Sequence, residues 1–158
     1  MTNCVTGEKI MNKIFNTSHI TMLNVIFNVP QNITMVICLS LFQGITDPVA
    51  IAATFIRAYG IGFAIGTILR LDNIGDAAAS LFNAKPGTTA HYIASNIAGG
   101  ALMGVLMNGA ITFMALGPVA AFWPAYIHTV IPAILVSAAA QCVWMKPSDL
   151  LAGKIADK

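Results

Sequence analysis

The sequence predicts an all-α integral membrane protein whose four transmembrane helices form two parallel-repeated helical hairpins. Of its 158 residues, 57% are hydrophobic and 9% are charged, whereas a soluble domain carries about 25% charged residues. No Asp, Glu, Lys or Arg occurs between Pro86 and Met145. Because one membrane-spanning helix needs about 20 apolar residues, this uncharged stretch is long enough for two spans.

Four hydrophobic segments can be delimited. They run from Ile20 or Ile26 to Ile45, from Pro48 to Leu69, from Tyr92 to Leu116 and from Val119 to Met145. The short sequences QGITDP and ALGP, which join the first pair and the second pair, contain residues that end helices and make turns. The predicted organisation is therefore a tail over 1–19, a hairpin over 20–69, a linker over 70–91, a hairpin over 92–145 and a tail over 146–158.

The beginning of the first hairpin allows two interpretations. Polar residues interrupt it at Asn24, Asn28, Pro30, Gln31 and Asn32. In one interpretation, residues 20–28 lie along the membrane interface and Pro30 starts the crossing helix, a position that proline favours. In the other, a single longer helix contains the proline as a kink.

The linker over 70–91 predicts a short helix on the membrane surface. Its apolar residues recur at helical spacing, and Asp72 or Asn73 is a candidate N-cap. The residues of this apolar face are Ile74, Ala77, Ala78, Leu81 and Phe82.

The distribution of basic residues predicts the orientation. Seven of the eight Lys and Arg residues lie in the two tails or at the ends of the linker, and neither hairpin turn contains one. Because cytoplasmic loops retain Lys and Arg, we expect both termini and the linker to be cytoplasmic. The protein is thus expected in a bacterial inner membrane as a multi-pass protein.

The two hairpins share short motifs in the same order. LFQG at Leu41–Gly44 matches LMNG at Leu106–Gly109, and Phe55–Tyr59 matches Phe122–Tyr126 as F-x-x-A-Y. This pattern predicts an internal duplication. Since each hairpin begins and ends on the same side, the two repeats would be related by an axis along the membrane normal.

These same stretches resemble a known family. ALMGVLMNGAITFMALG followed by FWPAYIHTVIPAILV resembles the two-helix hairpin of small bacterial inner-membrane proteins of a domain-of-unknown-function family, as does ICLSLFQG followed by FIRAYGIGFAIGTIL. The resemblance covers most of residues 26–145 and implies a tandem-hairpin architecture with no assigned activity. The second copy departs from the first in having Pro124 where the first has Arg57.

Two G-x-x-x-G pairs predict close helix packing. Gly62 and Gly66 lie in the second span, and Gly100 and Gly104 lie in the third. Such pairs let helix backbones approach each other in a membrane. They are expected to pack helices within one chain, or to form the interface of a homo-oligomer.

Arg57 is the only Lys or Arg inside a hydrophobic run, and it lies near the expected midplane of the second span. A cation at this depth costs at least about 2.5 kcal/mol, so it usually faces a partner, a cavity or water. We therefore expect an outward-opening ligand pocket, lined at comparable depth by Arg57, His128, Tyr59, Tyr126, Gln43 and Asn108. In the alternative, Arg57 reaches lipid phosphates and the amides join helices.

These features favour a transporter or channel-like protein for a small polar or anionic solute. The alternative is a non-catalytic accessory or structural subunit that docks onto a membrane partner through its Gly-rich faces. We expect no enzymatic activity, because Ser40, Ser95 and Ser137 lack a base and an acid at a known spacing, and paired carboxylates are absent.

No cofactor, metal or nucleic acid is expected. Cys4, Cys38 and Cys142 show no C-x-x-C spacing and have no neighbouring His that would make a zinc site. The net charge of +2 is small and scattered along the chain, so it does not form the basic patch of a nucleic-acid-binding protein. The expected partners are membrane lipid, a small ligand and further copies of the chain.

Overall fold

A computed structural model describes residues 3–69, 71–116 and 119–156, and this part of the chain is helical without any strand. The helices are α1 (Asn3–Phe42), α2 (Pro48–Leu69), α3 (Leu71–Leu81), α4 (Thr89–Leu116) and α5 (Phe122–Ala156). All except α3 are long and apolar enough to cross a membrane. The prediction of an all-α membrane protein with four spans is therefore confirmed.

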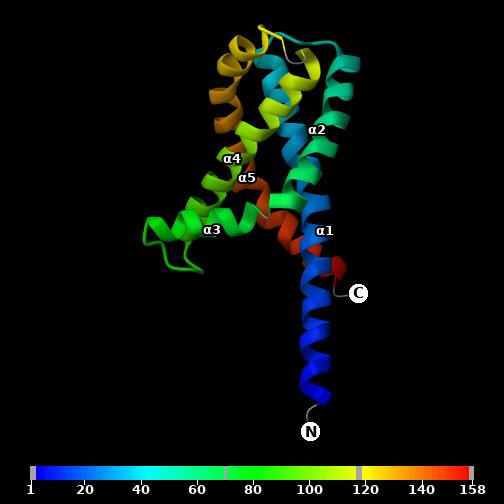
Figure 1. Ribbon diagram of the computed structural model, residues 1–158, viewed down its shortest axis with the longest axis vertical. Helices are drawn as coiled ribbons and strands as arrows, with labels where there is room; N and C mark the ends of the chain where they lie inside the picture. The colour runs from blue at the N-terminus through cyan, green and yellow to red at the C-terminus, as the bar shows by residue number, and fades with distance from the viewer. Residues whose placement is uncertain (1–2, 70, 117–118, 157–158) are drawn as a thin grey trace.

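The four long helices form a bundle (Figure 1). Around it, α1 packs against α2 and α5, and α4 packs against α5 and, less extensively, α2. Both hairpin turns lie at one end of the bundle, which we call the turn end. The first residues of α1, the surface helix α3 and the last residues of α5 lie toward the other, which we call the termini end.

The first span belongs to one long helix. α1 is continuous over 40 residues with Pro30 inside it, so the structure shows a single helix rather than an interfacial helix followed by a shorter span. Proline has no backbone N–H and interrupts the ladder of helical hydrogen bonds. Side chains add bonds nearby, as the Thr34 hydroxyl donates to the Pro30 carbonyl at 2.8 Å.

The other spans agree closely with the sequence. α2 has the predicted bounds, Pro48 to Leu69, and α4 begins three residues before the predicted Tyr92. α5 begins at Phe122 rather than Val119, and it continues beyond Met145 to Ala156. The C-terminal tail is therefore largely a helical extension of the fourth span.

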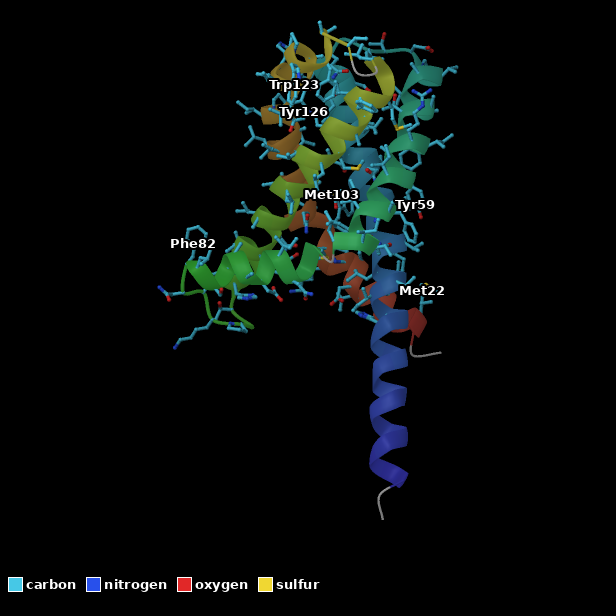
Figure 2. All side chains as sticks on the ribbon, in the orientation of Figure 1. Met22, Tyr59, Phe82, Met103, Trp123 and Tyr126 are labelled. Atoms are coloured by element: carbon cyan, nitrogen blue, oxygen red, sulfur yellow. The ribbon has the colours of Figure 1, made fainter. Side chains whose placement is uncertain are left out.

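The linker helix α3 differs in detail from the prediction. It begins at Leu71, so the two candidate N-cap positions, 72 and 73, lie inside its first turn. Its buried face is made by Gly75 and Ala79, while large apolar side chains of the predicted face, including Phe82, are exposed. Phe82 lies at the end of α3 that projects away from the bundle (Figure 2). Small residues thus face the bundle and large ones face its surroundings.

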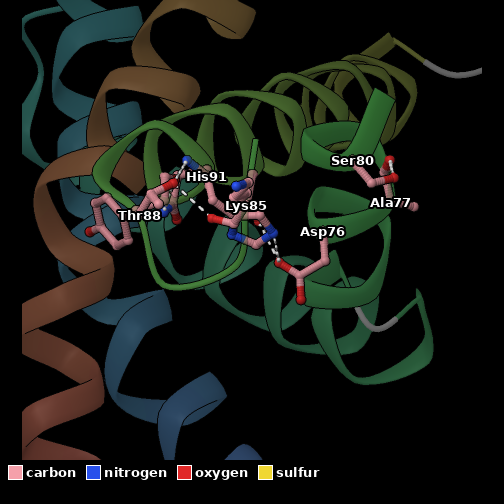
Figure 3. Close-up of polar contacts among 9 residues, drawn as sticks. Asp76, Ala77, Ser80, Lys85, Thr88 and His91 are labelled. Atoms are coloured by element: carbon pink, nitrogen blue, oxygen red, sulfur yellow. Dashed lines mark hydrogen bonds and ion pairs between the residues drawn. The ribbon is translucent and has the colours of Figure 1, made fainter. Parts of the chain in front are cut away.

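Polar contacts fix α3 to the start of α4 (Figure 3). His91 Nε2 lies 3.8 Å from Asp76 Oδ1, and the Ser95 hydroxyl donates to the same oxygen at 3.1 Å. The Thr88 hydroxyl accepts a hydrogen bond from the His91 backbone N–H and thereby caps α4. A Cβ on Gly75 would lie 2.6 Å from the Ser95 carbonyl oxygen, so this crossing requires glycine.

The motifs that predict a duplication occupy different places in the two hairpins. Leu41–Gly44 lies at the end of α1, whereas Leu106–Gly109 lies well inside α4. Phe55–Tyr59 lies inside α2, whereas Phe122–Tyr126 begins α5. The two hairpins are similar in architecture, and the duplication stays a prediction.

Candidate functional site

The interior of the bundle is unusually rich in neutral polar side chains. Among the described residues, the largest fully buried side chains are Met107, Gln31, Asn28, Asn32 and Ser137, and four of these five are polar. Burying a polar group in an apolar interior costs free energy unless it forms hydrogen bonds. The centre of the bundle, rather than its surface, is therefore the candidate site.

An amide ladder runs along the inner face of α1, made by Asn24, Asn28 and Asn32 at intervals of four residues. The side-chain Nδ2 of Asn32 donates to the Asn28 carbonyl at 2.8 Å, and that of Asn28 donates to the Asn24 carbonyl at 2.6 Å. Asn24 Nδ2 donates across to α2, to the Phe63 carbonyl and the Thr67 hydroxyl. Because a backbone carbonyl can only accept, these bonds fix which end of each amide is the nitrogen.

Glycines on α2 make room for the amide ladder. A Cβ built on Gly62 would lie 2.6 Å from Asn28 Oδ1 and 3.0 Å from Asn32 Nδ2, and one on Gly66 would lie 2.5 Å from Asn24 Oδ1. Any larger residue would displace these side chains. The first predicted glycine pair thus faces the polar interior.

The second glycine pair lies between α4 and α5. A Cβ on Gly100 would lie 2.6 Å from the Ala138 Cα, and one on Gly104 would lie 2.7 Å from the Ala133 carbonyl oxygen. Here the added Cβ would clash with backbone atoms of the neighbouring helix, which cannot move away by a side-chain rotation. All four glycines therefore pack against other helices of the same chain.

Two cavities lie on either side of one layer of side chains. The turn-side cavity, of about 160 Å³, lies between α1, α2, α4 and the first turn. Its polar lining residues are Asn32, Ser40, Gln43, Thr54, Asn108 and Thr112. The termini-side cavity, of about 80 Å³, lies between all four long helices, and its polar lining residues are Asn24, Asn28 and Gln141.

The layer between the cavities consists of Asn28, Asn32, Gly62 and Met103, and we call it the closing layer. Asn28 and Met103 line the termini-side cavity, whereas Asn32 lines the turn-side cavity. Asn32 Nδ2 donates to Asn28 Oδ1 at 3.2 Å, and the Met103 methyl group lies 3.4 Å from a Cβ built on Gly62. Two hydrogen-bonded asparagines one helical turn apart thus line different cavities.

The chemistry of both cavities is neutral. Their described lining consists of amides, hydroxyls, methionines, aliphatic side chains, Phe27 and Gly66, without an ionisable side chain. Since one water occupies about 30 Å³ of liquid, the cavities are large enough for a few waters or a small solute. An ion would find no opposite charge there to offset its lost hydration.

Two of the six predicted ligand residues line one cavity. Gln43 and Asn108 both face the turn-side cavity. Asn108 is also tied to α5, because its Nδ2 donates to the Tyr126 carbonyl at 3.3 Å and its Oδ1 accepts from the Thr129 hydroxyl at 3.0 Å. The Tyr126 ring lies elsewhere, stacked on the Phe122 ring with centroids 5.8 Å apart.

The structure does not bring the other predicted residues to this site. Arg57 and His128 are exposed on the outside of the bundle, and the His128 ring lies 5.8 Å from that of Phe42. Tyr59 lies beside Phe55, and Figure 2 shows Tyr59 and Tyr126 on opposite sides of the bundle. The six predicted residues, although expected at similar depth in the membrane, therefore do not line a common pocket.

Sequence reasoning missed the amide ladder and Gln141. The signal was present, because Asn24, Asn28 and Asn32 recur every four residues and so share one helix face. We interpreted these residues as interruptions of a hydrophobic span. The glycines opposite them, Gly62 and Gly66, recur at the same interval.

Neither a metal centre nor a known relative explains this site. The described residues contain no group of three or more His, Cys, Asp or Glu side chains that could hold a metal ion. The resemblance to domain-of-unknown-function hairpins stays a prediction. No family model, no curated protein and no solved structure matches this chain.

Proposed function

We propose that this protein is a channel-like or transport protein that passes a small uncharged polar solute through the centre of its bundle. The observation that carries this proposal is the pair of neutral, polar-lined cavities separated by the closing layer. The turn-side cavity reaches the exposed residues Gln43 and Ile45 at the first turn. The termini-side cavity extends to Ile20 and Met145 near the other end.

The closing layer is thin enough to open by side-chain motion. Asn28 and Asn32 are one helical turn apart, which corresponds to about 6 Å along the axis at 1.5 Å per residue. Met103 has a flexible thioether side chain that adapts to different packing arrangements. Rotation of Met103 and of the Asn32 amide would connect the two cavities without moving a helix.

The site supports an uncharged solute rather than an anion. An anion in a buried site is normally held by Arg, Lys or free N–H donors. Arg57 lies outside the bundle, and the Nδ2 groups of Asn24, Asn28 and Asn32 already donate within the protein. The sequence led us to expect a polar or an anionic solute. We therefore propose the uncharged polar solute of these two.

The same glycines bear on the accessory alternative. Docking through Gly-rich faces needs exposed glycines, and Gly62, Gly66, Gly100 and Gly104 all meet other parts of this chain. No other described feature favours the accessory role.

We propose cytoplasmic termini and an inner-membrane location from the basic residues. Lys85 follows α3, and Lys146 and Lys154 lie in the last part of α5. These two helix segments lie toward the termini end (Figure 1), and cytoplasmic segments retain Lys and Arg. Homo-oligomer formation stays a prediction.

The proposal is tested with purified protein in liposomes. Exchange of labelled urea and of labelled glycerol should exceed that of protein-free liposomes, whereas chloride exchange should not. Gly62→Val, which fills the closing layer, should slow both solutes by roughly tenfold or more, equivalent to a permeation barrier raised by about 1.4 kcal/mol. Gly60→Val is the matched control, because a Cβ on Gly60 meets nothing within 4 Å, and exchange through it should match the unmodified protein.

Two results would contradict the proposal. One is solute exchange no faster than in protein-free liposomes. The other is equal exchange through Gly62→Val and Gly60→Val when both variants are folded, as judged by circular dichroism and gel filtration.

Removing the charge of Arg57 should leave this transport intact. Because Arg57 is exposed on α2 and lines neither cavity, Arg57→Gln is expected to change urea exchange by less than about twofold. Asn108→Leu, which removes a polar group from the turn-side cavity, should reduce it more. A large loss of urea exchange in Arg57→Gln with little loss in Asn108→Leu would contradict this expectation. It would indicate that the solute binds at the outer face of α2.

A further inference from the structure

Two buried amide oxygens have no hydrogen-bond partner among the described residues: Gln141 Oε1, whose residue lines the termini-side cavity, and Gln31 Oε1, whose residue lines neither cavity. Gln31 is 1% exposed and Gln141 is 3% exposed. A buried carbonyl oxygen without a hydrogen-bond partner costs free energy. The cost is removed when a bound molecule donates a hydrogen to it.

The two glutamines belong to one contact between α1 and α5. Gln31 Nε2 donates to the Ser137 hydroxyl oxygen at 3.3 Å. Ser137 and Gln141 are four residues apart on α5 and therefore share a helix face. Gln141 lines the termini-side cavity, and the Gln31–Ser137 pair lies about one helical turn farther toward the turn end. Of the two unpaired oxygens, that of Gln141 thus belongs to a residue that lines the proposed path, whereas Gln31 lines neither cavity.

The donors of the neighbouring amide ladder are already occupied. Asn24, Asn28 and Asn32 each donate to a backbone carbonyl, and these bonds fix the orientation of their amides. The buried atom of the termini-side cavity that is left without a partner is therefore the acceptor Gln141 Oε1. A site of this kind favours molecules with N–H or O–H groups over equally polar molecules that only accept.

We propose that the termini-side cavity is a binding site that selects small uncharged hydrogen-bond donors, such as amides, ureas or small polyols, through Gln141. The size of the cavity, about 80 Å³, limits the ligand to a few non-hydrogen atoms, and the neutral lining excludes ions. This inference rests on the proposed solute passage and adds the selectivity of the site.

Three isomeric amides test the donor requirement at nearly constant size. Propionamide has two N–H donors, N-methylacetamide has one and N,N-dimethylformamide has none. Each is equilibrated on both sides of the liposome membrane, so its own permeation does not matter, and its inhibition of labelled-urea exchange is measured. Inhibition should be strongest for propionamide and weakest for N,N-dimethylformamide.

Replacing Gln141 should remove this discrimination. In Gln141→Leu, the half-inhibitory concentration of propionamide should rise about tenfold, equivalent to about 1.4 kcal/mol, while that of N,N-dimethylformamide stays the same. Gln141→Met, which keeps an unbranched side chain of similar length, is the second variant in case leucine impairs folding. Val143→Leu is the matched control on the same helix, because Val143 is 62% exposed, and it should retain the ranking of the wild type.

Failure of this inference can be told apart from failure of the proposed function. If urea exchanges but the three isomers inhibit equally, or if folded Gln141→Leu keeps the wild-type ranking, the selectivity is wrong and passage stands. The same result is expected if Gln141 merely holds a structural water. If wild-type protein exchanges no urea, the proposed function is wrong and this inference is overturned with it.

Discussion

Replacing Gly100 by alanine is expected to lower the free energy of unfolding of the bundle by about 2 kcal/mol, within the range found for overpacked interiors. The new Cβ would lie 2.6 Å from the Ala138 Cα and 2.9 Å from the Ser137 carbonyl oxygen. Both atoms belong to the α5 backbone, so the helices must separate to relieve the clash. Titration of the protein in mixed micelles with a denaturing detergent, followed by circular dichroism, measures the loss.

Gly60→Ala is the matched control for this substitution. Gly60 also lies inside a transmembrane helix, but nothing lies within 4 Å of its Cβ position. Its replacement should leave stability unchanged or raise it by up to about 1 kcal/mol, the helix propensity difference between glycine and alanine. Equal unfolding free energies for the two variants would mean that α4 and α5 do not pack backbone to backbone.

Replacing Asn28 by aspartate is expected to destabilise the protein by about 3 kcal/mol or more at neutral pH. The side-chain shape is nearly unchanged, but the Nδ2 donor becomes an oxygen. That oxygen would face the Asn24 carbonyl oxygen and Asn24 Oδ1, both 2.6 Å from the present nitrogen. An ionised carboxylate would thus meet two acceptors inside the bundle.

The same detergent titration, repeated at several pH values, tests this substitution. Protonation of the introduced carboxylate restores one donor, so the deficit should shrink as the pH falls. Asn83→Asp is the control, since Asn83 is exposed after the end of α3, and it should change stability by less than about 0.5 kcal/mol. A pH-independent deficit, or equal effects at both positions, would show that the amide ladder does not depend on its donors.

Hydropathy predicted the fold because the bilayer limits the alternatives. An apolar segment of about 20 residues can satisfy its backbone in lipid only as a helix or in a closed barrel. The length of Pro48–Leu69 and the turn residues before it therefore predicted α2 to the residue. The same reasoning did not decide whether Pro30 starts a helix or lies inside one, because that depends on the neighbouring residues. Around Pro30, Thr34 and the amides of α1 supply additional hydrogen bonds.

The candidate site was harder to predict because depth along a span says nothing about direction around it. Arg57 lies midway along α2, where nearly every residue is apolar or small, so the pattern did not reveal which face points outward. The amides of α1 have a regular spacing that does identify a face, but only contact with Gly62 and Gly66 shows that this face is internal. That contact joins residues far apart in the sequence.

Asparagine side chains of α1 pack against glycines of α2. We therefore expect these positions to change together in evolution. Lengthening the residue at 62 alone collides with Asn28 and Asn32, and lengthening the one at 66 alone collides with Asn24. A shorter partner, such as serine in place of asparagine, would relieve each collision. In descendants of this sequence, larger residues on α2 should therefore be inherited together with smaller ones on α1, so that the two helices diverge as pairs of positions.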